Sequence, residues 1–424
     1  MKNLMRETLQ NFRYLIKWIL ISALCGSLVG IVAAVFAALV TFVTGVRTDH
    51  PWLIYLLPPA GMLIIFLYRI TGGDETKGTN QVIRAIHRRE HVPYKIAPLI
   101  FISSVISHLF GASVGREGAA LQLGGSMGCF LGEKLKLDEN DRIIVIVSSM
   151  GAAFAAIFGT PVAAAFFAME VESVGIMHYS ALIPCVCASF AASRIALAFG
   201  VTPEHFGDVV VPDISLLSIL LIVLIAIIAA LVSTFFCELL GHTEDFLEHL
   251  FPSMYPTVFL AGTAVVLVSV LMGSTDYLGG GLPVIERALH GDAVWYAFIM
   301  KMIFTAICIG AGYKGGEIVP SLFIGATLGC TLGKLFGLSP SLAAACGMAS
   351  LFVGVTNCPV STLLLITELF GFEGILYYVI SIAVSYIMSG YHGLYKTQRI
   401  VWSKHRVGPA ESAASFQDQK TLYP

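Results

Sequence analysis

Gly115-Arg116-Glu117-Gly118, followed by Ala119-Ala120-Leu121-Gln122-Leu123-Gly124-Gly125, is the stretch that decides how this chain folds. Long apolar segments lie on both sides of it, so Arg116 and Glu117 sit where charge is costly. The glycines let the backbone approach a small ligand and open a helix, whose free N–H groups and dipole bind anions. Glu117 is itself an anion, so it can compete for that place or take up a proton and leave it. The stretch therefore predicts an anion site closed by a protonatable carboxylate.

The composition indicates a polytopic membrane protein. Of the 424 residues, 57% are hydrophobic and 12% are charged, whereas soluble domains are about 25% charged. The net charge of −2 gives no argument for a nucleic-acid partner. Uncharged windows cover 18–46, 143–169, 173–193, 214–237, 249–275, 335–367 and 374–395. About 20 apolar residues cross a bilayer, so most of these windows can span it, and 335–367 must contain a break.

The nine cysteines lie almost all in apolar segments, and none shows the CxxC spacing. This pattern argues against a metal site and against a disulfide framework. We expect packing roles for the cysteines, and neither a metal nor a cofactor.

The charge distribution predicts that both termini lie in the cytoplasm. The segment 1–17 carries four basic residues against one acid, and the loop 71–95 is also basic, as the positive-inside rule requires of cytoplasmic segments. We expect a first membrane half over 18–240 and a second over 241–400. The tail 401–424 is too short for a regulatory domain and is expected to be partly disordered beyond about Gly408.

The second half of the chain repeats the first. Gly159-Thr160-Pro161 divides an apolar stretch into helices predicted over 143–158 and 161–173, and Asn357-Cys358-Pro359 is its counterpart. Glu170 and Glu368 follow these prolines at the same distance, which suggests a shared structural role such as hydrogen bonding to neighbouring backbone. Repeats with interrupted helices point to a transport site near the middle of the bilayer. The pattern leaves parallel and inverted halves open, and inverted halves are the commoner solution.

Four features together resemble the CLC-type anion transporters. They are Gly115–Gly118 with Gln122 and Gly125, the glycine, acid and proline stretch 315–320, the two-fold repeat, and the late Tyr395. The resemblance covers about 50–400. It implies an all-α polytopic membrane protein with a CLC-type fold of two internally repeated, inverted halves and many broken or tilted helices. It also implies a homodimer in the lipid bilayer, with one anion pathway per subunit lined by helix N-termini.

The resemblance assigns roles to individual residues. Glu117 takes the place of the gating glutamate, which blocks the pathway when ionised and carries a proton when neutral. Tyr395 takes the place of the tyrosine that closes the inner end of the anion site. The residues expected to bind the anion are Gly78, Thr79, Asn80, Gly115, Arg116, Gly118, Ile318, Val319 and Tyr395.

Three departures from the chloride-transporting relatives change the expected substrate. The serine motif GSGIP is replaced by Gly78-Thr79-Asn80-Gln81-Val82. In the second half, Gly316-Glu317-Ile318-Val319-Pro320 carries isoleucine in place of an aromatic residue, with an acid before it. The internal proton glutamate of chloride/proton exchangers aligns with Val171. Glu172 is one residue away, which on a helix is about 100° off that face.

Together these departures resemble the bacterial fluoride/proton antiporters of the same family. The function predicted is export of fluoride in exchange for protons across a bacterial inner membrane, with Glu117 and Glu317 moving protons. Fluoride is strongly hydrated and needs good donors when its water is replaced. Asn80 offers an amide NH₂ and Thr79 a hydroxyl.

Several alternatives stay open. Arg116 is as well explained by a structural charge as by an anion role, Glu317 can simply cap the helix that follows it, and Thr79 and Asn80 can be helix caps. The alternative function is a chloride/proton exchanger or an uncoupled chloride channel of the same family, since Val171 fits a channel as well. An intramembrane enzyme is not predicted, because no HExxH motif occurs.

Overall fold

The structure is a computed structural model that describes residues 1–72, 78–88, 92–204, 206–207, 209–406, 408 and 410. In the first part of the chain it contains α1 (Lys2–Asp49), the 3-10 helix η1 (Pro51–Leu56), α2 (Leu57–Thr71), α3 (Gly78–Arg88), α4 (Ile96–Phe110), α5 (Glu117–Lys134), α6 (Glu139–Phe158), α7 (Pro161–Glu170), β1 (Ser173–Val174), η2 (Tyr179–Ala181) and α8 (Leu182–Ala198). The rest contains α9 (Leu216–Leu250), α10 (Met254–Met272), α11 (Leu282–Leu289), α12 (Ala297–Gly310), α13 (Ile318–Phe336), α14 (Pro340–Thr356), α15 (Pro359–Phe370), α16 (Ile375–Met388) and β2 (Arg399–Ile400).

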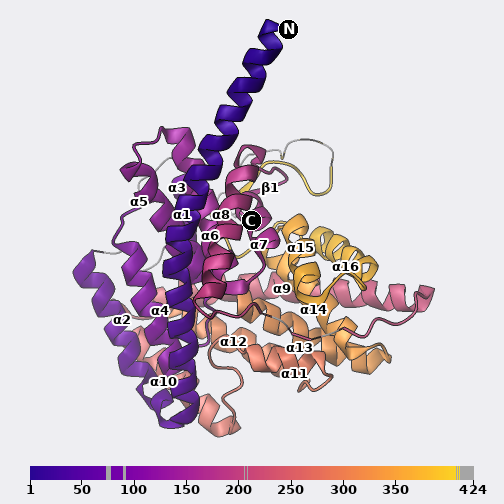
Figure 1. Ribbon diagram of the computed structural model, residues 1–424. Helices are drawn as coiled ribbons and strands as arrows, with labels where there is room; N and C mark the ends of the chain where they lie inside the picture. The colour runs from indigo at the N-terminus through magenta and orange to yellow at the C-terminus, as the bar shows by residue number, and fades with distance from the viewer. Residues whose placement is uncertain are drawn as a thin grey trace.

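Within the described ranges, seven helices are long and apolar enough to cross a membrane. They cover Asn3–Asp49, Pro51–Thr71, Glu139–Phe158, Tyr179–Ala198, Leu216–Leu250, Met254–Met272 and Ile318–Phe336. Several shorter apolar helices pack among them (Figure 1). This arrangement agrees with the polytopic membrane protein predicted from the composition.

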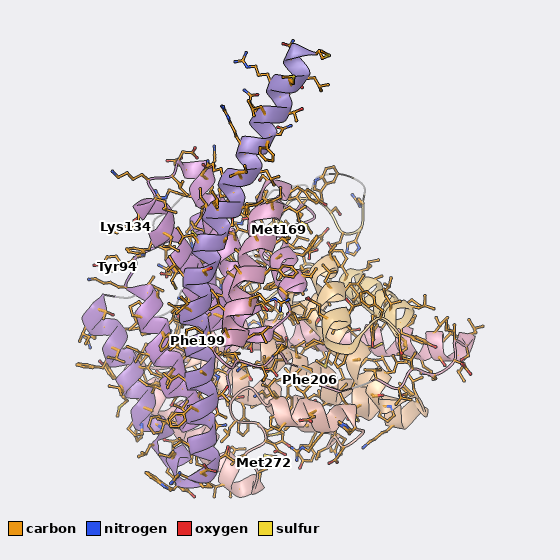
Figure 2. All side chains as sticks on the ribbon, in the orientation of Figure 1. Tyr94, Lys134, Met169, Phe199, Phe206 and Met272 are labelled. Atoms are coloured by element: carbon orange, nitrogen blue, oxygen red, sulfur yellow. The ribbon has the colours of Figure 1, made fainter. Side chains whose placement is uncertain are left out.

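The long helices α1 and α9 run through two boundaries expected from the sequence. The segment 1–17 is the beginning of the 48-residue α1 and projects from the rest of the molecule (Figure 2), with Lys17 at its end paired with Asp141. Packing of α1 begins at Trp18, which is fully buried. The expected boundary between the halves at residue 240 lies inside α9, because the polar stretch 238–248 continues that helix.

The two predicted helix breaks are present. α6 ends at Phe158, Gly159 takes the left-handed conformation with φ 75°, and Pro161 opens α7. In the second half Asn357 takes the place of that glycine with φ 60°, and Pro359 opens α15. Asparagine is one of the few residues that tolerate this backbone region. α7 ends at Glu170 rather than 173, because Ser173 already belongs to β1.

Glycines bring equivalent helix pairs of the two halves into close contact. A Cβ added at Gly124 of α5 would lie 2.4 Å from the Ser149 carbonyl oxygen of α6. A Cβ added at Gly325 of α13 would lie 2.5 Å from the Gly347 carbonyl oxygen of α14. Small residues allow this approach of backbones between membrane helices. The repeat read from the sequence is therefore also a repeat of packing.

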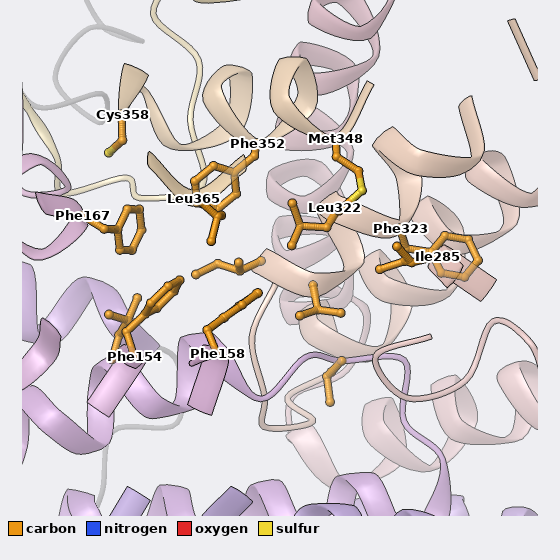
Figure 3. Close-up of a cluster of buried hydrophobic side chains, with 14 of the residues drawn as sticks. Phe154, Phe158, Phe167, Ile285, Leu322, Phe323, Met348, Phe352, Cys358 and Leu365 are labelled. Atoms are coloured by element: carbon orange, nitrogen blue, oxygen red, sulfur yellow. The ribbon is translucent and has the colours of Figure 1, made fainter. Parts of the chain in front are cut away.

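An aromatic cluster joins the halves at the centre of the core (Figure 3). The Phe154 ring lies 5.0 Å from that of Phe158 and 5.1 Å from that of Phe167. Phe167 in turn lies 5.7 Å from Phe352 of α14, between ring centroids. This contact links the first and second halves at the ends of their broken helices.

The last described residues fold back onto the first half. β2 pairs in parallel with β1, with Ser173 opposite Arg399 and Val174 opposite Ile400. The Gln398 side chain donates to the carbonyl oxygens of Val171, at 2.9 Å, and of Thr356, at 3.0 Å. These bonds fix the segment that carries Tyr395. Residues 411–424, for which partial disorder was expected, lie outside the described residues.

Candidate functional site

Two glycine loops hold each other at the centre of the site. The Gly115 N–H donates to the Gly316 carbonyl oxygen and the Gly316 N–H to that of Gly115, each at 2.6 Å. A Cβ added at Gly118 would lie 2.7 Å from the Gly316 Cα, so a side chain there would separate the loops. The starts of α5 and α13 are therefore held side by side.

Glu117 is the first residue of α5 and is only 1% exposed. An acid in this position is favoured by the free N–H groups and the dipole of the helix it begins. Its Oε1 lies 3.3 Å from the Arg116 Nε. Its Oε2 has no hydrogen-bond partner among the described residues. The carboxylate is thus buried and held through one oxygen.

Arg116 contacts two acidic side chains. Its Nη2 forms an ion pair with Glu204 of the segment after α8, and its Nε contacts Glu117. Its Nη1 lies 3.4 Å from the Thr41 hydroxyl of α1, and its Nη2 lies 3.5 Å from the Ile157 carbonyl oxygen of α6. The guanidinium therefore connects α1, α5, α6 and the segment after α8.

The second acid, Glu317, precedes α13. The Ser321 N–H makes the first bond of this helix, to the Glu317 carbonyl oxygen at 2.9 Å. The N–H groups of Ile318 and Val319 lie ahead of that bond, where a helix leaves its donors free. The Glu317 Oε2 lies 3.4 Å from the position of a Cβ added at Gly118. This carboxylate is therefore close to the start of α5.

α3 brings a third helix N-terminus to the same place. Gly78 opens it with a φ of 40°, and the Thr79 hydroxyl donates to the Gly118 carbonyl oxygen at 3.1 Å. The single O–H donor of Thr79 is thus used in a hydrogen bond to the α5 backbone. Its hydroxyl oxygen remains an acceptor, so in this conformation Thr79 supplies a structural tie rather than a donor for an anion.

The Asn80 amide is oriented by the segment that carries Tyr395. Its Oδ1 accepts from the Thr397 N–H at 3.2 Å. The Thr397 hydroxyl lies 3.1 Å both from that Oδ1 and from the Asn80 carbonyl oxygen. With the amide oxygen committed to Thr397, the NH₂ group of Asn80 points away from it. Tyr395 is 2% exposed, and its hydroxyl has no partner among the described residues.

Two cavities reach these residues, and each contains one of the two acids. The first, here named the Arg116 cavity, has a volume of about 420 Å³ and is lined by Thr41, Arg47, His108, Arg116, Glu117 and Asp276, among others. The second, the Lys396 cavity, has a volume of about 120 Å³ and is lined by Thr79, Asn80, Gln122, Glu317, Tyr395 and Lys396, among others. The Arg116 cavity adjoins the C-terminal end of α1 and the Lys396 cavity the start of α3, which Figure 1 shows toward opposite ends of the molecule.

The Lys396 cavity also holds an ion pair that the sequence did not predict. The Lys396 Nζ lies 2.5 Å from the Glu244 Oε2 on the polar end of α9. Gly310 permits the approach of α12 to this point, since a Cβ there would lie 3.1 Å from the Glu244 backbone nitrogen. The position of Lys396 directly after Tyr395 was the available signal for its role at the site.

Val171 occupies the place where chloride/proton exchangers were expected to carry their internal glutamate, and it is fully buried. The neighbouring Glu172 is also buried, and its Oε1 pairs with the Nδ1 of His178. Its Oε2 has no partner among the described residues. Glu172 therefore belongs to a contact with the segment between β1 and η2.

Glu204, Glu244 and Thr397 are the site residues that sequence reasoning missed. Glu204 lies 88 positions from its partner Arg116, and Thr397 lies 317 positions from Asn80. Neither belongs to a motif. Glu244 stood in the polar stretch 238–248, which gave no sign of facing Tyr395.

Comparisons with known proteins agree with the geometry. The family model described as voltage gated chloride channel matches residues 60–390. A relative from Pseudomonas syringae pv. tomato, named chloride/fluoride channel protein, is 35% identical over 94% of this chain and 90% of its own length. An H(+)/Cl(-) exchange transporter of Vibrio campbellii is 24% identical over 82% of this chain and 81% of its own.

A solved structure gives the same result for the fold. The crystal structure of a CLC-type fluoride/proton antiporter matches with a TM-score of 0.87 and 31% identity, over 91% of this chain and 98% of that one. The predicted all-helical CLC-type fold with two repeated, inverted halves is thereby confirmed, as is the prediction of a transport protein rather than an enzyme. The extent of the family match and the identity to the Pseudomonas relative lead to one conclusion: this chain belongs to the voltage gated chloride channel family, the CLC family.

Proposed function

We propose that this protein is a secondary antiporter that exports fluoride in exchange for protons. The observation that carries the proposal is the placement of the two acids. Glu117 and Glu317 begin helices that are joined through Gly115 and Gly316, yet Glu117 lines the Arg116 cavity and Glu317 the Lys396 cavity. A proton carrier therefore stands at each approach to one shared anion position.

The donors around that position suit a small, strongly hydrated anion. The N–H groups of Gly118, Ile318 and Val319 lie at the starts of α5 and α13, where helix dipoles favour negative charge. The Tyr395 hydroxyl and the Asn80 NH₂ group add side-chain donors from the Lys396 cavity. The proposed anion-binding residues also include two glycines, Gly78 and Gly115, which let the backbone approach the anion closely. Arg116 contributes its positive charge.

Glu117 is the gate in this proposal. When ionised it occupies the anion position at the start of α5, and when protonated it releases that position and carries the proton. Its single contact through Oε1 supports this role, because the carboxylate can leave after losing one ion-pair contact. Glu317 serves the Lys396 cavity in the same way.

A chloride/proton exchanger or an uncoupled chloride channel is the second candidate. Val171 in place of the internal glutamate supports a channel, and the Vibrio relative is named as a chloride exchanger. Against this candidate stand Asn80 in place of the serine motif and Glu317 in the second-half motif. The solved fluoride/proton antiporter favours fluoride, and the name of the Pseudomonas relative includes both halides.

The proposed setting is the inner membrane of a bacterium, with both termini in the cytoplasm and the Lys396 cavity open to it. We also propose a homodimer that uses the apolar surfaces around 178–236 and 370–389. Large exposed apolar side chains on these surfaces include Ile183, Phe190, Leu220, Leu224, Val379 and Ile387.

Flux from liposomes that contain the purified protein tests the function. Vesicles are loaded with fluoride or with chloride, and anion efflux and external pH are recorded together. The proposal predicts fluoride efflux with matching proton uptake into the vesicles, and little chloride movement. Chloride efflux comparable to that of fluoride would identify a general halide exchanger or channel instead.

A further inference from the structure

Arg116 is shared between two carboxylates that reach it from different parts of the chain. Glu117, the next residue in the chain, contacts it through one oxygen, 3.3 Å from Nε, whereas Glu204 forms the closer ion pair with Nη2. The guanidinium is 11% exposed, Glu204 17% and Glu117 1%. Arg116 therefore lies between the more exposed Glu204 and the buried Glu117.

The segment after α8 is built to place Glu204 at this point. The Glu204 N–H donates to the Phe158 carbonyl oxygen at 3.0 Å, at the end of α6. Pro203 packs on the adjoining break, because a Cβ added at Gly159 would lie 2.4 Å from the Pro203 Cβ. The backbone at Glu204 is therefore fixed to the same turn whose Ile157 carbonyl oxygen faces Arg116.

A guanidinium has a fixed number of N–H donors. A carboxylate that takes some of them therefore weakens the ion pair that the same arginine forms with a second carboxylate. Charge interactions are strongest where water is scarce, and an arginine fork is directional. With Nη2 turned to Glu204, Arg116 meets Glu117 through Nε alone. Without the charge of Glu204, the fork is free to turn fully to Glu117.

We propose that Glu204 is a positioning residue for the gate: it draws Arg116 away from Glu117 and so sets how readily the ionised gate leaves. This inference rests on the proposed gating role of Glu117. It concerns the outer proton step and does not depend on which halide is carried.

Other charged groups around the Arg116 cavity are engaged elsewhere. Arg47 donates to the His108 carbonyl oxygen at 2.6 Å, and the His108 Nδ1 lies 2.8 Å from the Ser104 carbonyl oxygen. Lys301 donates to the Gly279 carbonyl oxygen at 2.5 Å. Two further groups complete the surroundings: Asp276, paired with Arg287 at 2.7 Å, and Glu317, close to Gly118.

The test compares Glu204→Gln with Asp276→Asn in liposome flux at a series of external pH values. Asp276 lines the Arg116 cavity and pairs with Arg287, so its substitution also removes one negative charge but leaves both ion pairs of Arg116 in place. Glu204→Gln should strengthen the hold of Arg116 on ionised Glu117. We expect flux near neutral pH to fall roughly three- to tenfold, and its half-maximum to move about half a unit to one unit toward acid pH. Asp276→Asn should keep the wild-type profile, and Glu204→Asp should restore most of it.

A second pair of variants separates positioning from a general structural effect. In a Glu117→Gln background the gate has no charge for Arg116 to hold, so adding Glu204→Gln should leave the flux and its pH profile unchanged. A wild-type profile for Glu204→Gln, or an acid shift that persists in the Glu117→Gln background, would overturn the proposal. Recording both halides keeps the outcomes distinct: a failure of the fluoride proposal appears as chloride flux, and a failure of this one as an unshifted profile.

Discussion

Glu170 and Glu368 cap each other's helices. Glu170, the last residue of α7, accepts from the N–H groups of Val360, at 3.2 Å, and Ser361, at 2.9 Å, at the start of α15. Glu368, near the end of α15, accepts from the N–H groups of Val162, at 3.1 Å, and Ala163, at 2.7 Å, at the start of α7. The role in backbone hydrogen bonding suggested by the repeat is thereby confirmed. Each acid bonds to the backbone of the other half of the chain.

Removing either cap should destabilise the protein, and Glu170 should matter more. Glu170 is 7% exposed and also accepts from the Ser361 hydroxyl at 2.7 Å, whereas Glu368 is exposed. We expect Glu170→Ala to cost about 2–3 kcal/mol of unfolding free energy, as buried bonds to charged groups do, and Glu368→Ala about 1 kcal/mol.

Thermal denaturation in detergent checks this order, with the exposed Glu373→Ala as a control. Equal losses for Glu170→Ala and Glu368→Ala would contradict the argument from burial.

Glu117→Gln should separate anion movement from proton movement. The amide has the shape of the protonated gate but cannot release a proton, so the anion position stays accessible while coupling is lost. We expect fluoride efflux to persist without proton uptake in the liposome assay. A variant that still pumps protons under a fluoride gradient would remove Glu117 from the mechanism.

Thr79→Ser combined with Asn80→Gly should relax the selection of fluoride over chloride. The change removes the amide donor that Thr397 holds in place and loosens the tie of Thr79 to Gly118. We expect the ratio of fluoride to chloride flux to fall about tenfold, which is the effect of losing one well-placed hydrogen bond to a charge.

The single variant Thr397→Val is the informative companion, since it leaves Asn80 in place and removes only the hydroxyl contacts to it, while the N–H of residue 397 still donates to the Asn80 Oδ1. An intermediate ratio is expected for it. An unchanged ratio in the double variant would mean that this stretch serves only as a helix cap.

The pair of His178 and Glu172 should make stability depend on pH. The hydrogen bond that His178 donates to the Glu172 carboxylate, opposed by partial burial, raises the pKa of His178 above its usual value of 6.5. A raised pKa in the folded state means that the contribution is fully present below pH 6.5 and is lost as the pH rises through the folded value. We expect the melting temperature of the wild type to fall between pH 6 and pH 8 by more than that of His178→Gln. Parallel curves for the two proteins would show that the pair contributes nothing.

The sequence predicted the parts of the site that are contiguous and repeated. Gly115–Gly118 and Glu317 could be located because glycines, acids and prolines recur at matching positions in both halves. Thr79 shows the limit of this reasoning, because nothing in the sequence indicated that its hydroxyl donates to the Gly118 carbonyl oxygen; its role in anion binding stays a prediction. Glu204 and Thr397 could not be predicted at all. Their partners lie far away in the sequence, and packing of the segment after α8 and of the tail brings them together.

The reciprocal bonds between Gly115 and Gly316 act as a common pivot for the two acids. Glu117 and Glu317 directly follow the two loops whose glycines, Gly115 and Gly316, are bonded to each other at 2.6 Å. A shift of α5 along its axis therefore has to be passed on to α13. Rotation about the side-chain bonds of Glu117 or Glu317 meets no such constraint. For the proposed function this means that the two acids act by rotation of their side chains, while the starts of α5 and α13 stay together.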